Sequence, residues 1–142
     1  MKRRILVNIL ISFCLCFLLG SEHTVMSQES SLSPPVVEAA IPVFPVVALA
    51  THQQGQVLVR VRIRNDGTVK SVEFCSGPSI FRPLLKMVAS RWKFAPTNKT
   101  SEERSAILSF IFRLVPTDTE SVLPIYRPPY EVEVRGRIPN AK

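Results

Sequence analysis

Side chains that could do chemistry are few in this chain of 142 residues, and they lie far apart in the sequence. Beyond the first 27 residues the single histidine is His52 and the single cysteine is Cys75, whereas a protein-bound metal ion needs several such ligands at close spacing. Asp66 lies in a predicted turn and Glu102-Glu103 in a predicted loop, so no carboxylate pair is placed for acid–base work. The sequence has no glycine-rich phosphate loop. We therefore expect no enzyme activity, no metal site and no cofactor.

Cys75 has two interpretations. In the first it is a small residue of a strand, where a free cysteine behaves as a hydrophobic side chain. In the second it forms an intermolecular disulfide, because an unpaired cysteine in an exported protein is a candidate for such a bond. An internal disulfide is excluded if Cys14 and Cys16 leave with the N-terminal segment that contains them. The second interpretation predicts a homodimer.

A basic stripe lies on the face of the predicted sheet that the helix leaves uncovered. Such a stripe is typical either of a solvated face or of a surface that binds nucleic acid, anionic lipid or an acidic partner. No aromatic residue is interleaved with the arginines for base stacking, so we do not expect nucleic acid. The remaining interpretations are a solvated face, balanced in part by Glu73, Glu131 and Glu133, and an acidic or lipid surface. The stripe comprises Arg60, Arg62, Arg64 and Lys70.

The stretch from Gly55 to Pro96 holds the elements that must position these side chains. In its first part apolar residues recur at every second position with mostly arginines between them, which predicts a strand with one buried face. Asn65-Asp66-Gly67 supplies residues that tolerate positive φ, so a tight turn leads into a second strand from Val69 to Cys75. The apolar positions of the first strand are Val57, Val59, Val61 and Ile63.

The hydrophobic period changes after Ser76-Gly77-Pro78. Apolar residues at positions 81, 84, 85, 88 and 92 share one side of a helix. Pro83 fits the first turn of that helix, where its missing N–H costs least, and Pro96 prevents any continuation. Trp92 and Phe94 follow as large aromatics, which we expect to anchor the core. Alternation from Ala106 to Leu114 predicts a third strand.

These pieces, in this order, resemble the C-terminal domain of TonB proteins. The resemblance rests on Gly-x-Val-x-Val-x-Val-x-Ile, Asn-Asp-Gly-x-Val, a strand ending in Ser-Gly, and Trp-Lys-Phe-x-Pro at 92–96. Upstream, residues 42–48 are similar to the Pro-x-Tyr-Pro-x-x-Ala segment of that family, with Phe44 in place of tyrosine. The resemblance covers roughly Glu38 to Val115, and it implies a second, shorter helix near the Pro-x-Phe-Pro segment.

The expected fold is α+β. If the helix crosses over right-handed from the second strand and the third strand runs parallel to the second, the third must lie beside the first. The result is a three-stranded antiparallel sheet in the order 2-1-3, with the long helix and the short N-terminal helix on one face. The tail adds a candidate fourth strand at Tyr130 to Arg135, where the residues alternate again; the alternative is a loosely packed or disordered tail.

The third strand would then form an edge of the sheet, with unpaired N–H and C=O groups that can template another strand. The family resemblance implies that a partner segment adds at this edge, and we expect Ile107, Ser109, Ile111 and Arg113 to form the site. Residues 130–135 could instead occupy the same edge, either permanently or as a plug that a partner displaces. We favour permanent occupation.

The N-terminus carries the pattern of a secretory signal peptide. Lys2-Arg3-Arg4 precedes an apolar run from Ile5 to Leu19, and small residues follow. As a helix this run would span only about 22 Å, short of a hydrocarbon core of about 30 Å, which favours cleavage over membrane anchoring. The predicted organisation is a signal peptide at 1–27, a linker at 28–40, the TonB-like domain at 41–115 and a Pro-containing tail at 116–142.

The predicted function is that of a periplasmic or exported protein that binds a protein or peptide partner by β-strand addition. The family links such domains to transmembrane transport, so an outer-membrane receptor is a candidate partner. The first alternative is a structural or oligomerising module that dimerises through the strand edge or Cys75. The second is a truncated adaptor to inner-membrane proton-driven complexes, held in the inner membrane by an uncleaved N-terminus; only in that case would the protein contact a membrane.

Overall fold

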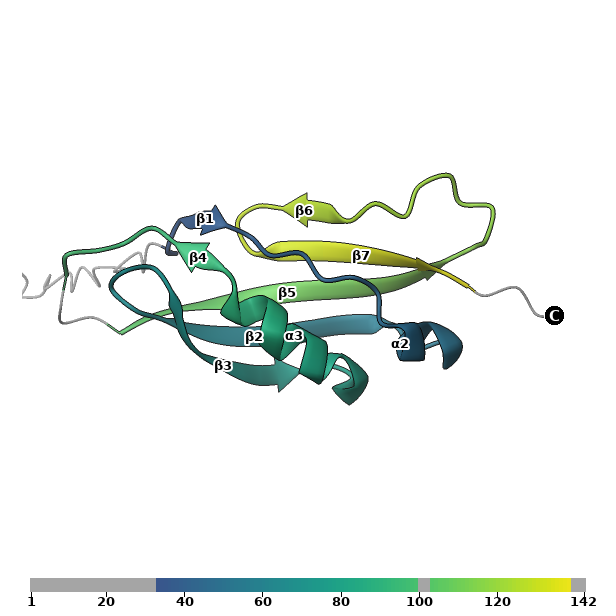
Figure 1. Ribbon diagram of the computed structural model, residues 1–142, viewed down its shortest axis with the longest axis horizontal. Coiled ribbons are helices and arrows are strands. Elements are labelled where there is room, and N and C mark those ends of the chain that lie inside the picture. The colour runs from purple at the N-terminus through teal and green to yellow at the C-terminus, as the bar shows by residue number, and fades with distance from the viewer. Residues whose placement is uncertain (1–32, 100–102, 139–142) are drawn as a thin grey trace, which may run out of the picture. The chain divides into compact units, whose positions relative to one another are not determined.

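The computed structural model describes residues 33–99 and 103–138. The signal peptide predicted for residues 1–27 lies outside these ranges. The described residues form β-strands, two short helices, α2 and α3, and a 3₁₀ turn, η1 (Figure 1). In chain order the elements are β1 (Val36–Glu38), α2 (Val46–Ala50), β2 (Gly55–Ile63), β3 (Val69–Ser76), η1 (Ser79–Phe81), α3 (Arg82–Ser90), β4 (Lys93–Phe94), β5 (Arg104–Val115), β6 (Ile125–Arg127) and β7 (Glu131–Arg137).

The predicted hairpin is present as β2 and β3, which pair antiparallel. Its turn is stabilised by Asp66, whose carboxylate accepts hydrogen bonds from the backbone N–H and the hydroxyl of Thr68 at 2.9 and 2.7 Å. Gly67 has a φ of +90°, and a Cβ there would lie 1.9 Å from the carbonyl oxygen of Phe94. Only glycine fits at that position, because the turn packs directly against the backbone of the segment that follows α3.

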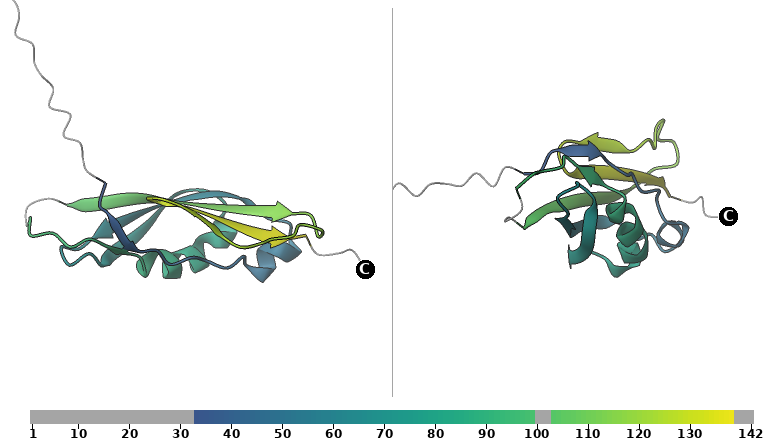
Figure 2. Two further views of the ribbon diagram at one scale, coloured as in Figure 1. Left: turned by 90° about the horizontal axis from the view of Figure 1, so that it is seen from above. Right: turned by 60° about the vertical axis from the view of Figure 1, so that its left-hand side comes forward.

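The predicted helix is present as η1 and α3 and covers the apolar face of β2, but α3 ends at Ser90, so Trp92 lies after the helix and not on it. Figure 2 shows α2 and α3 on the same face of the sheet. The alternating apolar residues of β2 are 0–6% exposed, and Leu85 and Ala89 of α3 are fully buried. Trp92 and Phe94 are 0% and 2% exposed, and the Trp92 indole N–H donates to the carbonyl of Ala40 at 2.9 Å. The indole therefore anchors both the core and the segment before α2.

The segment that leads into α2 is held by aromatic contacts. Phe44 stands edge-on to Phe81 and Phe112, with ring centroids 6.2 and 5.6 Å apart, while Phe81 and Phe112 stack with centroids 4.0 Å apart. The ring at position 44 thus joins the N-terminal segment to η1 and β5. The short helix expected near this segment is α2, which begins directly after Pro45.

The sheet differs from the expected three-stranded antiparallel sheet. The described residues form five strands in the order β3-β2-β5-β7-β6. The neighbours β3–β2, β2–β5 and β6–β7 are antiparallel, but β5 and β7 are parallel, so the sheet is mixed. The fold is α+β, as expected, and the extra strands come from the tail. The candidate fourth strand predicted at Tyr130 to Arg135 is present as β7, and the tail also supplies β6, which was not predicted.

The tail reaches β5 by turning back on itself. β6 runs against β7 as a hairpin, and β7 lies between β6 and β5 (Figure 1). The N–H of Ser109 donates to the carbonyl of Tyr130 at 2.9 Å, where the parallel pairing begins, and the N–H of Ile138 donates to the carbonyl of Val115 at 3.0 Å, where it ends. Val132 and Val134 are 0% and 4% exposed, so β7 is part of the hydrophobic core.

A second, two-stranded sheet joins β1 to β4. The sequence did not predict it, because strands of three and two residues are too short to show a hydrophobic period. The Tyr130 hydroxyl donates to the carbonyl of Pro34 at 2.7 Å, and the Phe94 and Tyr130 rings are 6.3 Å apart. These contacts place the start of the described chain beside the turn between β6 and β7.

Candidate functional site

The predicted binding edge is only partly free. Ser109, Ile111 and Arg113 face Glu131, Glu133 and Arg135 of β7 in the parallel register. The tail folds back and supplies backbone partners to these three residues, as in the favoured prediction that residues 130–135 occupy this edge. Ile107 alone, of the four predicted site residues, lies outside the paired stretch. A partner strand at Ser109–Val115 would therefore have to displace β7.

The remaining part, Arg104–Leu108, is called here the open edge of β5. Within residues 33–99 and 103–138, β5 pairs with β2 along this stretch, and no strand pairs with its other side. The Ser109 N–H points towards β7, and the direction of N–H and C=O groups alternates along a strand. The backbone groups of Ser105 and Ile107 consequently point outwards from the sheet, and the Ile107 side chain is 48% exposed.

Two contacts hold the ends of the open edge in place. The Arg104 guanidinium donates to the carbonyl of Ala95 at 2.6 Å, which fixes the start of β5 against the chain that follows β4. Tyr130 lies at the other end of the open edge, directly before β7. Burial of its phenol raises the pKa of that group. A segment added along the open edge would therefore meet Tyr130 and stop there.

A charged cluster, called here the Glu133 cluster, covers the part of the edge that the tail occupies. Glu133 is 3% exposed, and its carboxylate accepts hydrogen bonds from the guanidiniums of Arg127 and Arg135, both at 2.9 Å. Arg113 of β5 lies 3.5 Å from the same carboxylate. The donated hydrogen bonds, from Arg135 first and Arg127 second, hold the pKa of Glu133 below its usual value. The cluster links β5, β6 and β7 by charge.

The basic stripe is partly neutralised within the chain. Arg60 lies 3.6 Å from Glu73 and Arg62 lies 2.7 Å from Glu103, while the Arg64 guanidinium donates to the carbonyl of Val69 at 2.7 Å. The expected balance by Glu73 is present. Glu131 and Glu133 instead pair with arginines of the tail and β5. These pairs favour a solvated face over a surface held ready for an anionic ligand.

The residues first considered for chemistry lie apart in space as well as in sequence. Asp66 is in the β2–β3 turn, where the Thr68 hydroxyl lowers its pKa, and Cys75 is exposed on β3. His52 follows α2 with a φ of +51°. Among the described residues, no group of three or more His, Cys, Asp or Glu side chains is arranged to hold a metal ion. In the same ranges, no helix is both long and apolar enough to cross a membrane.

Sequence reasoning missed the Glu133 cluster and the role of Arg104. The alternation of Glu131-Val132-Glu133-Val134-Arg135 predicted a strand, but it did not reveal which cations surround the carboxylate. Two of those cations, Arg113 and Arg127, come from β5 and β6, and their approach depends on how β7 pairs with these strands; the third, Arg135, belongs to β7 itself. A glutamate is rarely buried in a strand unless it is paired. Glu133 itself was therefore the residue in the sequence that pointed to such partners.

Comparison with known proteins identifies one family. The family model described as "Gram-negative bacterial TonB protein C-terminal" matches residues 40–114. One solved structure with a similar fold is the solution NMR structure of the Pseudomonas aeruginosa TonB C-terminal domain, at 22% sequence identity and a TM-score of 0.46. The match covers 58% of this chain and 87% of that one. No curated protein matches the chain.

Proposed function

The chain belongs to the family of Gram-negative bacterial TonB protein C-terminal domains, and from this premise we propose that it binds an extended segment of an envelope protein by β-strand addition. The partner strand pairs with the open edge of β5, Arg104–Leu108. We further propose that the protein works in the periplasm and has no catalytic role. The observation that carries the proposal is that β7 covers β5 only from Ser109 onwards, although β5 itself begins at Arg104.

Backbone pairing supplies the affinity in this mode of binding. A strand beside the open edge would pair with the outward N–H and C=O groups of Ser105 and Ile107, as peptides do when they extend a sheet. The exposed Ile107 side chain would contact an apolar side chain of the partner on the outer face of the sheet. A segment of about four or five residues fills the stretch before Tyr130.

The tail stays in place in this proposal. Displacing β7 would expose Val132 and Val134, which are 0% and 4% exposed, and would separate the Glu133 carboxylate from Arg113. Full burial of one valine is worth about 1.5–3 kcal/mol, so a partner would need to replace several kcal/mol of contacts before it gained any of its own. Addition beside β7 needs no such exchange, which is why we favour the open edge over a displaceable tail.

The proposal is tested first by photo-cross-linking in Gram-negative cells. A photoreactive amino acid replaces Ser105, which is exposed at the open edge, and a control places it at Leu123, which is 73% exposed outside the edge. We expect cross-links from position 105 to one segment of an envelope protein, with none to that segment from position 123. Equal cross-linking at both positions would contradict the proposal. The identity of the segment decides whether an outer-membrane receptor is the partner.

The second step measures the affinity of a synthetic peptide of that segment by calorimetry. Ile107→Pro removes the N–H that points to the open edge and leaves the β2 ladder intact, because proline is tolerated where the N–H faces outwards. Ile107→Ala removes only the side chain and is the matched control. We expect the proline variant to lose binding by at least about tenfold and the alanine variant to lose only a few-fold. Binding that survives Ile107→Pro unchanged would exclude strand addition here.

A further inference from the structure

The Glu133 cluster lies on the face of the sheet that α2 and α3 leave uncovered. Val132 and Val134 are buried on the helix face, and side chains alternate along a strand, so Glu133 and Arg135 point to the other face. Arg113 of β5 is the register partner of Arg135 and shares that face. Two like charges directly opposite each other are unfavourable unless an opposite charge compensates them. Glu133 supplies that charge to both arginines.

Positive charge exceeds negative charge in and around this cluster, because three arginines are matched by two glutamates. Arg127 donates one Nη group to Glu131 and the other to Glu133, both at 2.9 Å. Arg113 and Arg135 instead turn their Nε atoms towards the same carboxylate oxygen of Glu133, at 3.5 and 2.9 Å. Their two guanidiniums therefore stand side by side.

The outer parts of these two guanidiniums remain available to a ligand. Within the ranges that the structure describes, the Nη groups of Arg113 and Arg135 donate to no other residue. The two side chains are 58% and 31% exposed, whereas Glu133 is 3% exposed beneath them. An anion that approaches this face therefore meets the guanidiniums before it meets the carboxylate.

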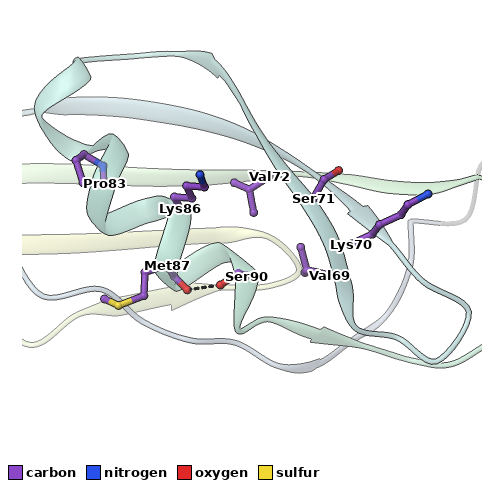
Figure 3. A pocket seen from close by; sticks show the side chains of 8 residues that line it. All are labelled: Val69, Lys70, Ser71, Val72, Pro83, Lys86, Met87 and Ser90. Atoms are coloured by element: carbon purple, nitrogen blue, oxygen red, sulfur yellow. Dashed lines mark hydrogen bonds between the residues drawn. The ribbon is translucent and has the colours of Figure 1, made fainter.

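Other cations of the sheet and of α3 are not combined in this way. Arg60 and Arg62 each lie beside a carboxylate of their own. Figure 3 shows Lys70 and Lys86 at the groove of about 410 Å³ between β3 and α3, where their side chains point in opposite directions. One small anion cannot contact both lysines.

We propose that Arg113 and Arg135 bind a phosphomonoester on the uncovered face of the sheet. Each guanidinium offers a planar pair of N–H donors that matches two oxygens of an oxyanion. A carboxylate has two oxygens and occupies one such pair, whereas the phosphate of a monoester has three terminal oxygens and can bridge both guanidiniums. Glu133 holds the guanidiniums in position. This site is separate from the open edge of β5 and does not rest on strand addition there.

The test uses the full chain labelled with ¹⁵N and inorganic phosphate at low salt, with the arginine Nε–H signals as the measurement. We expect saturable shifts at Arg113 and Arg135, with a Kd of roughly 1–10 mM. Sodium chloride should weaken binding, because exposed charges are screened. Acetate at matched ionic strength is the control and should bind at least about threefold more weakly, since it fills only one guanidinium.

Two monoesters distinguish a soluble ligand from a lipid headgroup. Glycerol 3-phosphate and dihexanoyl phosphatidic acid, the latter used as a monomer in solution, carry the same phosphate, and only the second carries acyl chains. Both should shift the signals of Arg113 and Arg135. A Kd at least about fivefold lower for the phosphatidic acid would assign the site to a lipid, because buried acyl surface adds to the affinity. Equal Kd values would assign it to a soluble monoester.

Variants of exposed arginines separate this site from general attraction to a basic protein. Arg113→Gln should weaken phosphate binding by at least about fivefold, by removing hydrogen bonds to a charged group. Arg113→Lys keeps the charge without the planar donors and should weaken it several-fold. Arg91→Gln removes an exposed arginine that follows α3, outside the cluster, and should change the Kd by less than about twofold.

Unchanged amide shifts of Val132 and Val134 in Arg113→Gln would show that β7 stays in place, so that a loss of binding reports on the site. Arg135 is not varied, because it also holds Glu133. The proposal is overturned if acetate binds as tightly as phosphate, if Arg91→Gln has the effect of Arg113→Gln, or if phosphate leaves the Nε–H signals of Arg113 and Arg135 unshifted.

Discussion

At the scale of single residues, Glu133 does more than any other side chain to define how the tail is held. Its carboxylate is bound by arginines from three strands, Arg113 from β5, Arg127 from β6 and Arg135 from β7. The arginine side chains are 31–58% exposed, so the carboxylate is shielded mainly by its own partners. A charge that is both buried and fully paired stabilises its surroundings only while every partner stays in place.

Glu133→Gln should therefore lower the free energy of unfolding at pH 7 by about 1–3 kcal/mol, the range for hydrogen bonds to a charged group. The folded-state pKa of Glu133 lies below its usual value because Arg135 and Arg127 donate to it. Its contribution is then fully present above the unfolded pKa of about 4.3 and is lost as the pH falls through the folded pKa. The difference between the wild type and the variant should shrink over that window in urea unfolding curves.

Glu131→Gln is the matched control for this measurement. Among the described residues Glu131 forms an ion pair with Arg127 only, and its side chain is 35% exposed. A surface pair of this kind contributes less than about 1 kcal/mol. Equal losses in the two variants, or a loss in Glu133→Gln that stays constant below pH 4, would show that the Glu133 cluster does not hold the tail.

At the scale of elements, the hairpin of β6 and β7 decides which part of β5 is accessible. It covers Ser109–Val115 and leaves Arg104–Leu108 open. Its anchoring is apolar as well as charged, since Val132 and Val134 are buried and Tyr126 stands edge-on to Trp92, with ring centroids 6.2 Å apart. The hairpin is therefore part of the hydrophobic core.

A chain that ends at Asp118 should lose amide protection in β5 at Ser109 and Ile111, whose backbone groups β7 pairs. Ser105 and Ile107 should exchange rapidly with and without the tail, because β7 does not reach them. Hydrogen exchange followed by NMR measures each amide. The amides of Val59 and Val61 in β2 report whether the shortened domain is still folded. Unchanged protection at Ser109 in a folded, shortened chain would mean that β7 does not pair with β5 in solution.

At the scale of the whole molecule, the sequence predicted the elements with a clear hydrophobic period and missed those without one. Val57 to Ile63 and the helix ending near Trp92 are long enough for a period of 2 or 3.6 to be read. β6 has three residues between prolines and gives no such signal. The parallel register of β7 depends on how the chain turns at 116–130, which no local pattern encodes. For that reason the sequence predicted that residues 130–135 could occupy this edge, but not that their pairing begins at Ser109 and leaves Ile107 outside it.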